Sequence, residues 1–185
     1  MLKGTYTTGG IDMTEFWDIL DENGNATSRI HERGKPMRKG EYHLVVYVWI
    51  ENDKGEFLIS KRTPNKRFPG LWECTGGNAV SGDDSLTTAV KETKEELGII
   101  LQPQNGRRIR HQIRGCSACE NCLGDVWLFQ QNVDLKEVTL APEETCAAMW
   151  ASREKINRMI EEGTFTTWGL FRRMEELFEN VKTDR

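Results

Sequence analysis

A glycine-rich turn that leads into an acidic helix constrains this chain more than any other feature. Residues 77–99 read GNAVSGDDSLTTAVKETKEELGI. One of the polar residues 83–85 can cap the start of the helix, and Gly98 stands where a left-handed C-cap is expected. Mostly apolar residues recur at helical spacing, and the resulting stripe is suited to packing on a sheet: Leu86, Val90, Thr93 and Leu97, with Ala89 beside them.

Three carboxylates share the other side of this helix. Glu92, Glu95 and Glu96 are three or four residues apart or adjacent, so they converge on one patch. Like charges at that spacing repel one another, and a bound divalent cation would remove the repulsion. Oxygen ligands suit Mg²⁺ or Mn²⁺, so the patch predicts a metal site for phosphate chemistry. The competing interpretation is an ordinary solvated acidic helix face.

The same stretch resembles the Nudix box, which is written G-x5-E-x7-R-E-U-x-E-E-x-G-U with U an aliphatic residue. The matching residues are Gly77, Glu92, Glu95, Glu96, Gly98 and Ile99, and three positions differ: Asp83 stands for Glu, Lys91 for Arg and Thr93 for the aliphatic residue. A lysine cannot make the planar two-bond contact of an arginine, so the metal shell is expected to be held less firmly. The resemblance implies an α/β (α+β) fold, namely an α/β/α sandwich with a mixed β-sheet.

The resemblance also implies roles for particular residues. Glu92, Glu95 and Glu96 are expected to be catalytic and to bind Mg²⁺ or Mn²⁺, and an additional acid is expected at Glu143 or Glu144, with Glu144 taken as catalytic. The general base stays open, because the family places it in different elements.

Two further groups of residues are candidates for binding the substrate. The backbones of Gly76 and Gly77 can approach phosphates closely, because neither residue has a side chain. Lys61 and Arg62 begin a cationic run that continues at Lys66 and Arg67, and an arginine fork can hold phosphate with two bonds. Phe68, Trp72 and Trp168 could stack on a base, although core packing is the preferred interpretation for them.

The function implied is metal-dependent hydrolysis of the pyrophosphate bond in a nucleoside diphosphate linked to another moiety. One alternative is an enzyme like isopentenyl-diphosphate isomerase, since residues 15–69 resemble that branch of the superfamily and His43, more loosely His31, stands at a position like its metal ligands. However, Gly76 and Gly77 occupy the place of its catalytic cysteine, and Cys74 is displaced from it. The other alternative is a Nudix domain that senses a ligand without catalysis.

Composition excludes several other classes of protein. The 185 residues carry a net charge of −4, which disfavours a stable nucleic-acid partner, and no stretch of about 20 apolar residues suggests a membrane span. Residues 1–12 lack the apolar core of a secretory signal, so the expected location is the cytoplasm. We expect a loosely ordered extension over residues 1–12 and one Nudix domain over residues 13–185. The expected partner is a small-molecule diphosphate substrate. The resemblance also leaves a homodimer open, because family members are often dimers.

The five cysteines raise a separate question. Cys116, Cys119 and Cys122 are regularly spaced, and with His111 they could form a tetrahedral zinc site. A standard zinc ribbon has two separated pairs, so reduced thiols in a loop over residues 115–124 are the preferred interpretation. Two other cysteines, Cys74 and Cys146, are expected to be buried.

Hydrophobic periodicity and turn residues predict the other elements. The expected strands are 15–20, 43–50, 56–61, 71–75, 107–114, 125–132 and 147–151, and the expected helices after the box are 152–162 and 167–181.

Overall fold

In a computed structural model of the chain, residues 14–116 and 119–179 are described, without the side chains of residues 114–120. The extension expected over residues 1–12 lies outside the described part. The strands are β1 (Phe16–Leu20), β2 (Ala26–Glu32), β3 (His43–Glu51), β4 (Phe57–Arg62), β5 (Trp72–Glu73), β6 (Gly106–Cys116), β7 (Cys119–Gln130) and β8 (Thr145–Ala151). The helices are α1 (Ser85–Leu97), α2 (Arg153–Glu161) and α3 (Met174–Phe178), with a 3₁₀ turn at Pro103–Asn105.

A mixed six-stranded sheet forms the centre of the fold. Its strand order is β5-β4-β3-β7-β6, with β8 paired to the other side of β4. The β3–β7 pair is parallel over its whole length, from His43↔Cys122 to Glu51↔Gln130, and the other pairs are antiparallel. Strand β3 is a run of Val, Tyr, Trp and Ile buried on both faces, as expected for a central strand between two layers.

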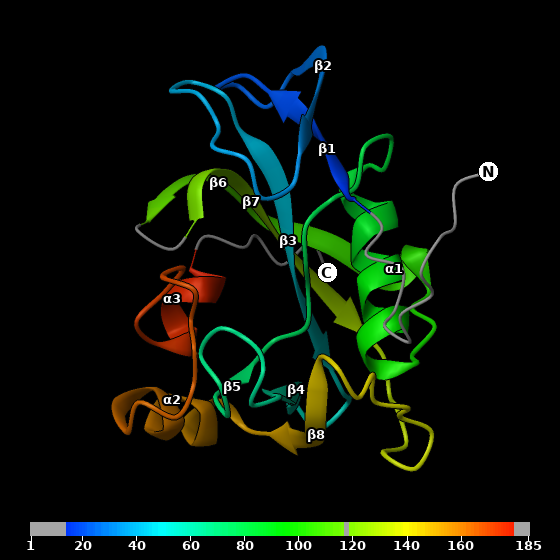
Figure 1. The fold of residues 1–185 in the computed structure, drawn as a ribbon. Helices are drawn as coiled ribbons and strands as arrows, with labels where there is room; N and C mark the ends of the chain where they lie inside the picture. The colour runs from blue at the N-terminus through cyan, green and yellow to red at the C-terminus, as the bar shows by residue number, and fades with distance from the viewer. Residues whose placement is uncertain (1–13, 117–118, 180–185) are drawn as a thin grey trace, which may run out of the picture.

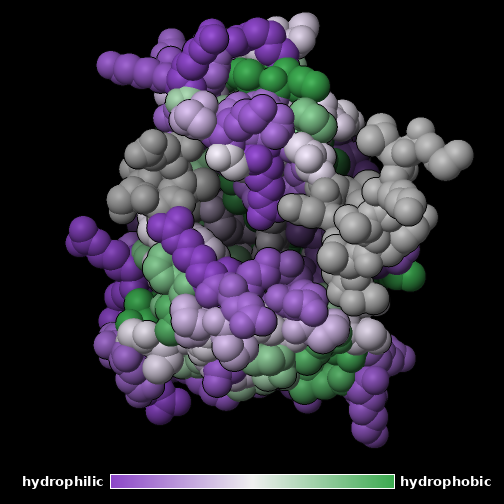
Figure 2. All heavy atoms as spheres, viewed as in Figure 1, coloured by the Kyte–Doolittle hydropathy of each residue, from purple (hydrophilic) through white to green (hydrophobic). Residues whose placement is uncertain are grey.

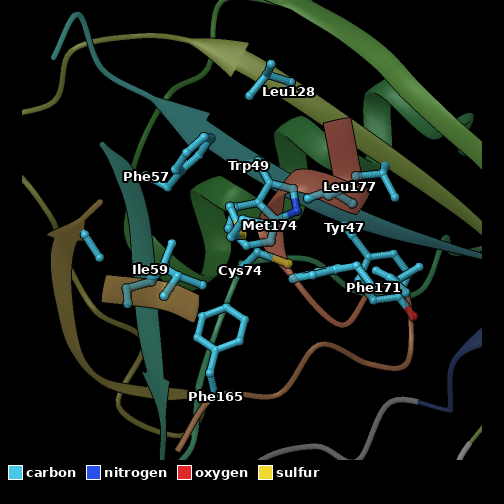
Figure 3. Packing of buried hydrophobic residues seen from close by; sticks show 14 of the residues in the cluster. Tyr47, Trp49, Phe57, Ile59, Cys74, Leu128, Phe165, Phe171, Met174 and Leu177 are labelled. Atoms are coloured by element: carbon cyan, nitrogen blue, oxygen red, sulfur yellow. The ribbon is translucent and has the colours of Figure 1, made fainter. Parts of the chain in front are cut away.

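Helices cover both faces of this sheet (Figure 1). One core cluster joins one face of β3 to α2, α3 and the segment before α3, and Trp49 lies at its centre against Phe57 and Phe171, with ring centroids 5.5 and 5.8 Å away (Figure 3). The other cluster packs Val46 and Val48 of β3 against Ala89 and Leu97 of α1. The predicted α/β/α sandwich with a mixed sheet is therefore confirmed.

A two-stranded hairpin, β1–β2, stands apart from the main sheet (Figure 1). It is joined to the body through backbone hydrogen bonds between Leu20 and Tyr42 and through Ser81, whose N–H donates to the Phe16 carbonyl (2.7 Å). Strand β1 was predicted from the sequence, over residues 15–20, but β2 was not. Residues 26–32 are largely polar and exposed, so they lack the alternation that marks a half-buried strand.

Two other expectations about secondary structure were wrong. The segment 115–124 was expected to be a loop, yet β6 continues to Cys116 and β7 begins at Cys119, because ladder pairing satisfies the backbone despite the turn-like composition. The last helix was expected over residues 167–181, yet α3 covers Met174–Phe178. The chain before it turns at Trp168 (φ 53°) and Gly169 (φ 71°), which a helix does not permit.

Candidate active site

Helix α1 is fixed in place at both ends and along one side. The Asp84 carboxylate caps its start by accepting a hydrogen bond from the Thr87 N–H (2.7 Å), and Gly98 ends it with φ 69°. Thr93, the residue that departs from the aliphatic pattern, is fully buried, and its hydroxyl donates to the Ala89 carbonyl (2.8 Å). The predicted apolar side therefore faces the sheet, and the acidic side is left for the site.

The two glycines before the helix bring the chain close to β3 and to α1. The Val46 N–H donates to the Gly77 carbonyl (2.9 Å), which holds this loop along β3. A Cβ added at Gly76 would lie 2.2 Å from the Val46 carbonyl oxygen, and the φ of Gly76 is +148°. A Cβ at Gly77 would lie 2.4 Å from the Glu92 carboxyl group. The backbone packing therefore requires glycine at position 76, whereas at position 77 a side chain would displace the Glu92 carboxyl group.

A cavity of about 650 Å³ lies between the helix, this loop, the β1–β2 hairpin and the segments that follow β4 and precede β8. Figure 2 shows the molecule hollowed below the hairpin, with hydrophilic residues around much of the hollow. The lining includes six acids and five bases, namely Glu15, Glu73, Glu92, Glu95, Glu96 and Glu144 with Arg33, Lys35, Arg62, Lys66 and Arg67. A cavity with both charges on its walls suits a ligand that carries anionic groups and a cation.

Two of the helix carboxyl groups are held in an unfavourable setting for negative charge. Burial, followed by the charge of Glu95, raises the pKa of Glu92 to about 7. Burial also raises the pKa of Glu96 to about 8, although the Thr75 hydroxyl and the Gly76 N–H (3.4 Å) both donate to its carboxylate. The charge of Glu92 contributes further to the raised pKa of Glu96. A cation beside these groups would stabilise their ionised forms.

The donor set fits a hard divalent cation in its chemistry, since it consists of carboxylate oxygens that repel one another. In the described part of the chain, however, no group of three His, Cys, Asp or Glu side chains lies close enough together to hold a metal ion. Glu92 and Glu96 are half-buried and Glu95 is exposed, although all three line the cavity. The predicted convergence of three carboxylates is thus present as a shared wall rather than as a closed set of ligands.

The comparison with known proteins decides the family. A model of the NUDIX domain matches residues 41–173. An uncharacterized Nudix hydrolase from Listeria innocua is 34% identical over 165 residues, which cover 88% of this chain and 95% of that protein. The chain belongs to the Nudix family. With this, the predicted enzyme class is confirmed as a hydrolase of phosphorus-containing acid anhydrides.

Solved structures agree with this placement of the chain among Nudix proteins. A MutT protein from Methanosarcina mazei is 27% identical, with a TM-score of 0.58 over 75% of this chain and 91% of its own. The fold is also shared with DR0079 from Deinococcus radiodurans, at a TM-score of 0.65 and 19% identity over 82% of this chain and 92% of its own.

Several residues of this Nudix protein that were predicted to bind the substrate or to act in catalysis already have partners within the chain. Arg62 lines the cavity, but its Nη1 donates to both carboxylate oxygens of Glu73 (2.7 and 2.9 Å), and its guanidinium lies over the Trp168 ring at 5.1 Å. Burial raises the pKa of Glu73, a rise that the Arg62 charge opposes. Lys61 is not among the described residues that line the cavity. Its ammonium group instead lies 5.8 Å from the centroid of the Trp72 ring. Glu144 lines the cavity and is paired with Lys66.

Sequence reasoning missed the contribution of the N-terminal hairpin to the Nudix cavity. Its side of the lining comprises Glu15, Trp17, Arg33, Gly34, Lys35, Pro36 and Met37. Trp17 stacks on the buried His43 with ring centroids 4.1 Å apart, and the His43 Nε2 lies 3.2 Å from the Asn78 amide oxygen. The one available signal was the Asn-Gly hairpin turn, which places the segment after β2 back beside β1.

The cysteine predictions have mixed outcomes. The side chains of Cys116 and Cys119 lie outside the described part, so a zinc site there stays untested. Cys122 is buried, and the His111 Nδ1 lies 2.5 Å from the Asp125 carboxylate. Cys74 is buried as predicted, but Cys146 is exposed, because it sits at the start of β8 on the side away from the core.

Proposed function

We propose that this Nudix protein hydrolyses the phosphoanhydride bond of a small-molecule diphosphate, in particular a nucleoside diphosphate linked to another moiety, with Mg²⁺ or Mn²⁺. The observation that carries the proposal is the position of Glu92 and Glu96. Both are half-buried on the wall of a cavity that also carries five bases, and burial together with neighbouring acids disfavours their negative charge. Half-buried carboxyl groups of this kind do not fit an ordinary solvated acidic helix face, and they do fit a site that binds a cation.

The chemistry of phosphoanhydride hydrolysis suggests a role for each group of residues that lines the cavity. A phosphoanhydride resists attack by water because its own oxygens repel a nucleophile. A divalent cation, when bound, would neutralise this negative charge and orient the phosphate group that is attacked. In this proposal Glu92 and Glu96 hold the cation, with Glu95 as a further ligand. Thr75 and the Gly76 N–H keep the Glu96 carboxylate in one orientation. Basic side chains among the residues that line the same cavity would bind the anionic groups of the substrate.

Glu144 is the proposed general base. It lines the cavity from the segment before β8, and its charge is near enough to contribute to the raised pKa of Glu92. Its carboxylate is paired with Lys66, and from the cavity wall it can accept a proton from the attacking water. Substitution of Glu144 by Gln is therefore expected to lower kcat and to leave KM largely unchanged.

A panel of diphosphate compounds tests the proposal. The full chain is incubated with dinucleoside polyphosphates, nucleoside diphosphate sugars and isopentenyl diphosphate, with Mg²⁺ or Mn²⁺. Cleavage products are identified by mass spectrometry, and an isomerised product, which has the mass of the substrate, is identified by proton NMR. Release of a phosphate-containing fragment, lost in Glu96→Gln and kept in the exposed control Glu137→Gln, supports hydrolysis. Isomerised product without phosphate release would replace the proposal with the isomerase alternative. Binding without turnover of any compound would replace it with a ligand sensor.

Other parts of the proposal concern the surroundings of the enzyme. None of the described helices has the length and apolar character needed to cross a bilayer. A cytoplasmic location, a single Nudix domain over residues 13–185 and the absence of a stable nucleic-acid partner belong to the proposal. Light scattering of the purified chain distinguishes a monomer from a homodimer.

A further inference from the structure

The β1–β2 hairpin forms part of the cavity although residues 14–40 lie outside the matched NUDIX domain. Its position relative to the box is fixed by polar contacts. The Ser81 hydroxyl and the Gly82 N–H both donate to the Asp18 carboxylate, at 2.6 and 3.0 Å. The same loop leads directly into α1, so the hairpin and the acidic helix are held as one unit.

Arg33 follows β2 at the mouth of the cavity. Its guanidinium pairs with Glu15 across the hairpin at 2.7 Å, and the two side chains are 52% and 38% exposed. Both residues line the cavity. They also lie within electrostatic reach of the helix acids, because the charge of Glu15 helps to raise the pKa of Glu92 and the charge of Arg33 lowers it.

Arg62, the arginine predicted from the sequence, is poorly placed to bind a phosphate in comparison. Its Nη1 is bound by Glu73, its Nε donates to the Arg67 carbonyl (2.5 Å), and only 12% of its side chain is exposed. Release of Arg62 would leave the Glu73 carboxylate buried without this partner, which is costly. Release of Arg33 would leave Glu15 in contact with water, where it stays solvated.

We propose that Arg33 binds a phosphate group of the diphosphate substrate and that its ion pair with Glu15 breaks when the substrate binds. The inference rests on the proposed function, since it places this phosphate opposite the helix carboxylates. A guanidinium presents parallel N–H groups that match two oxygens of a phosphate, whereas Glu15 offers one carboxylate in an exposed pair that contributes little. In this proposal the hairpin, which lies outside the matched NUDIX domain, is a substrate-recognition element.

The proposal makes opposite predictions for the two members of the ion pair. Arg33→Gln removes the phosphate ligand and should weaken binding at least tenfold. Glu15→Gln removes a competitor for Arg33 and a negative charge from the cavity mouth, so binding should tighten about threefold, by the charge arguments above. A purely structural pair would instead lose affinity in both variants.

Calorimetric titration of the full chain with methylenediphosphonate and Mg²⁺ tests these predictions, because this probe cannot be hydrolysed. Arg29→Gln is the matched control: Arg29 lies on the same hairpin, pairs with Glu41 at 2.5 Å, has the same 52% exposure and is not among the described residues of the lining. It should bind like the wild type. Arg33→Lys keeps the charge but loses the fork, and should fall between the wild type and Arg33→Gln.

Three results would overturn the inference. If the wild type binds the probe and Arg33→Gln binds it within twofold, or if Glu15→Gln weakens binding as much as Arg33→Gln, Arg33 is not a phosphate ligand, and the proposed hydrolase function is unaffected. If the wild type binds no diphosphate at all, the inference and the proposed function both fail.

Discussion

Substitution of either glycine of the pair before α1 by alanine separates damage to the fold from damage to the site. At Gly76 the added Cβ would meet the Val46 carbonyl oxygen at 2.2 Å, with φ at +148°. The atoms that this Cβ would meet belong to the backbone of Val46 and Tyr47, so the loop must leave β3. Backbone strain of about 1–3 kcal/mol together with the clash gives an expected loss of about 3 kcal/mol. For a chain of this size that lowers Tm by roughly 6–12 °C.

At Gly77 the added Cβ would meet a different kind of neighbour. The Glu92 carboxyl lies 2.4 Å from the Cβ position, and it is the end of a flexible side chain. Glu92 must therefore move about 1 Å to restore ordinary contact, while the backbone conformation suits alanine. A displacement of about 1 Å at a catalytic group lowers rates on the order of 100-fold. We predict that the Tm of Gly77→Ala lies within about 2 °C of the wild-type Tm, because moving the end of one flexible side chain costs little stability.

The two variants are compared by thermal unfolding, by Mn²⁺ binding in electron paramagnetic resonance and by turnover of the compound found in the diphosphate panel. Gly82→Ala is the control, because Gly82 has φ +92° but no heavy atom within 4 Å of the Cβ position. It should lose about 1–2 kcal/mol from left-handed strain and keep wild-type turnover per folded molecule. Full Mn²⁺ affinity and full turnover in Gly77→Ala would refute the assigned role of Glu92.

Three further predictions follow from groups around the same cavity. The metal-free protein should lose stability as pH rises from about 5 to 8, because the raised pKa values of Glu92 and Glu96 (about 7 and 8) make the folded state bind more protons than the unfolded state in that window. Addition of Mn²⁺ should restore the Tm at pH 8 and change it little at pH 5. A Tm that does not vary with pH would contradict this prediction. Thr75→Val should weaken Mn²⁺ binding by about 10–100-fold, whereas Thr75→Ser keeps the hydroxyl and should retain affinity; equal affinity in both variants would exclude an orienting role. Arg62→Met should cost about 3 kcal/mol by stranding the buried Glu73, and Arg62→Met combined with Glu73→Gln should recover much of it in urea unfolding; no recovery would show that the loss is one of packing.

The parts of the fold predicted correctly are those with strong local signals. Helix α1 was predicted with its end at Gly98 and its start among residues 83–85, because capping residues, an apolar stripe and a C-cap glycine all agree over one stretch. Strand β3 was predicted over residues 43–50 because this stretch is rich in Val, Tyr and Trp, and the structure extends it by one residue to Glu51. By contrast, β2 is polar on both sides and is a strand because β1 pairs with it, which no local pattern encodes.

Long-range contacts explain what the sequence left undetermined in the site. Arg62 looked like a phosphate ligand because its type and its basic neighbours were visible, whereas its pairing with Glu73 depends on the register of β4 with β5. Likewise, the segment before α3 was predicted to be helical because Leu170 continues the helical spacing of the apolar residues in α3. In the structure Trp168 instead turns back and donates its Nε1–H to Glu73 (3.1 Å). Arg33 reaches the cavity only through the docking of the hairpin on the box loop.

Diffraction at an energy that detects manganese provides the most direct test of the central claim, that the acidic wall of α1 holds a divalent cation against a bound diphosphate. Crystals are grown with Mn²⁺ and methylenediphosphonate. The account predicts an anomalous peak within about 2.0–2.3 Å of oxygens of Glu92 and Glu96 and of the diphosphonate, since manganese takes such oxygen ligands. A bound diphosphonate with manganese elsewhere in the molecule, or with no manganese in contact with either carboxylate, would contradict it.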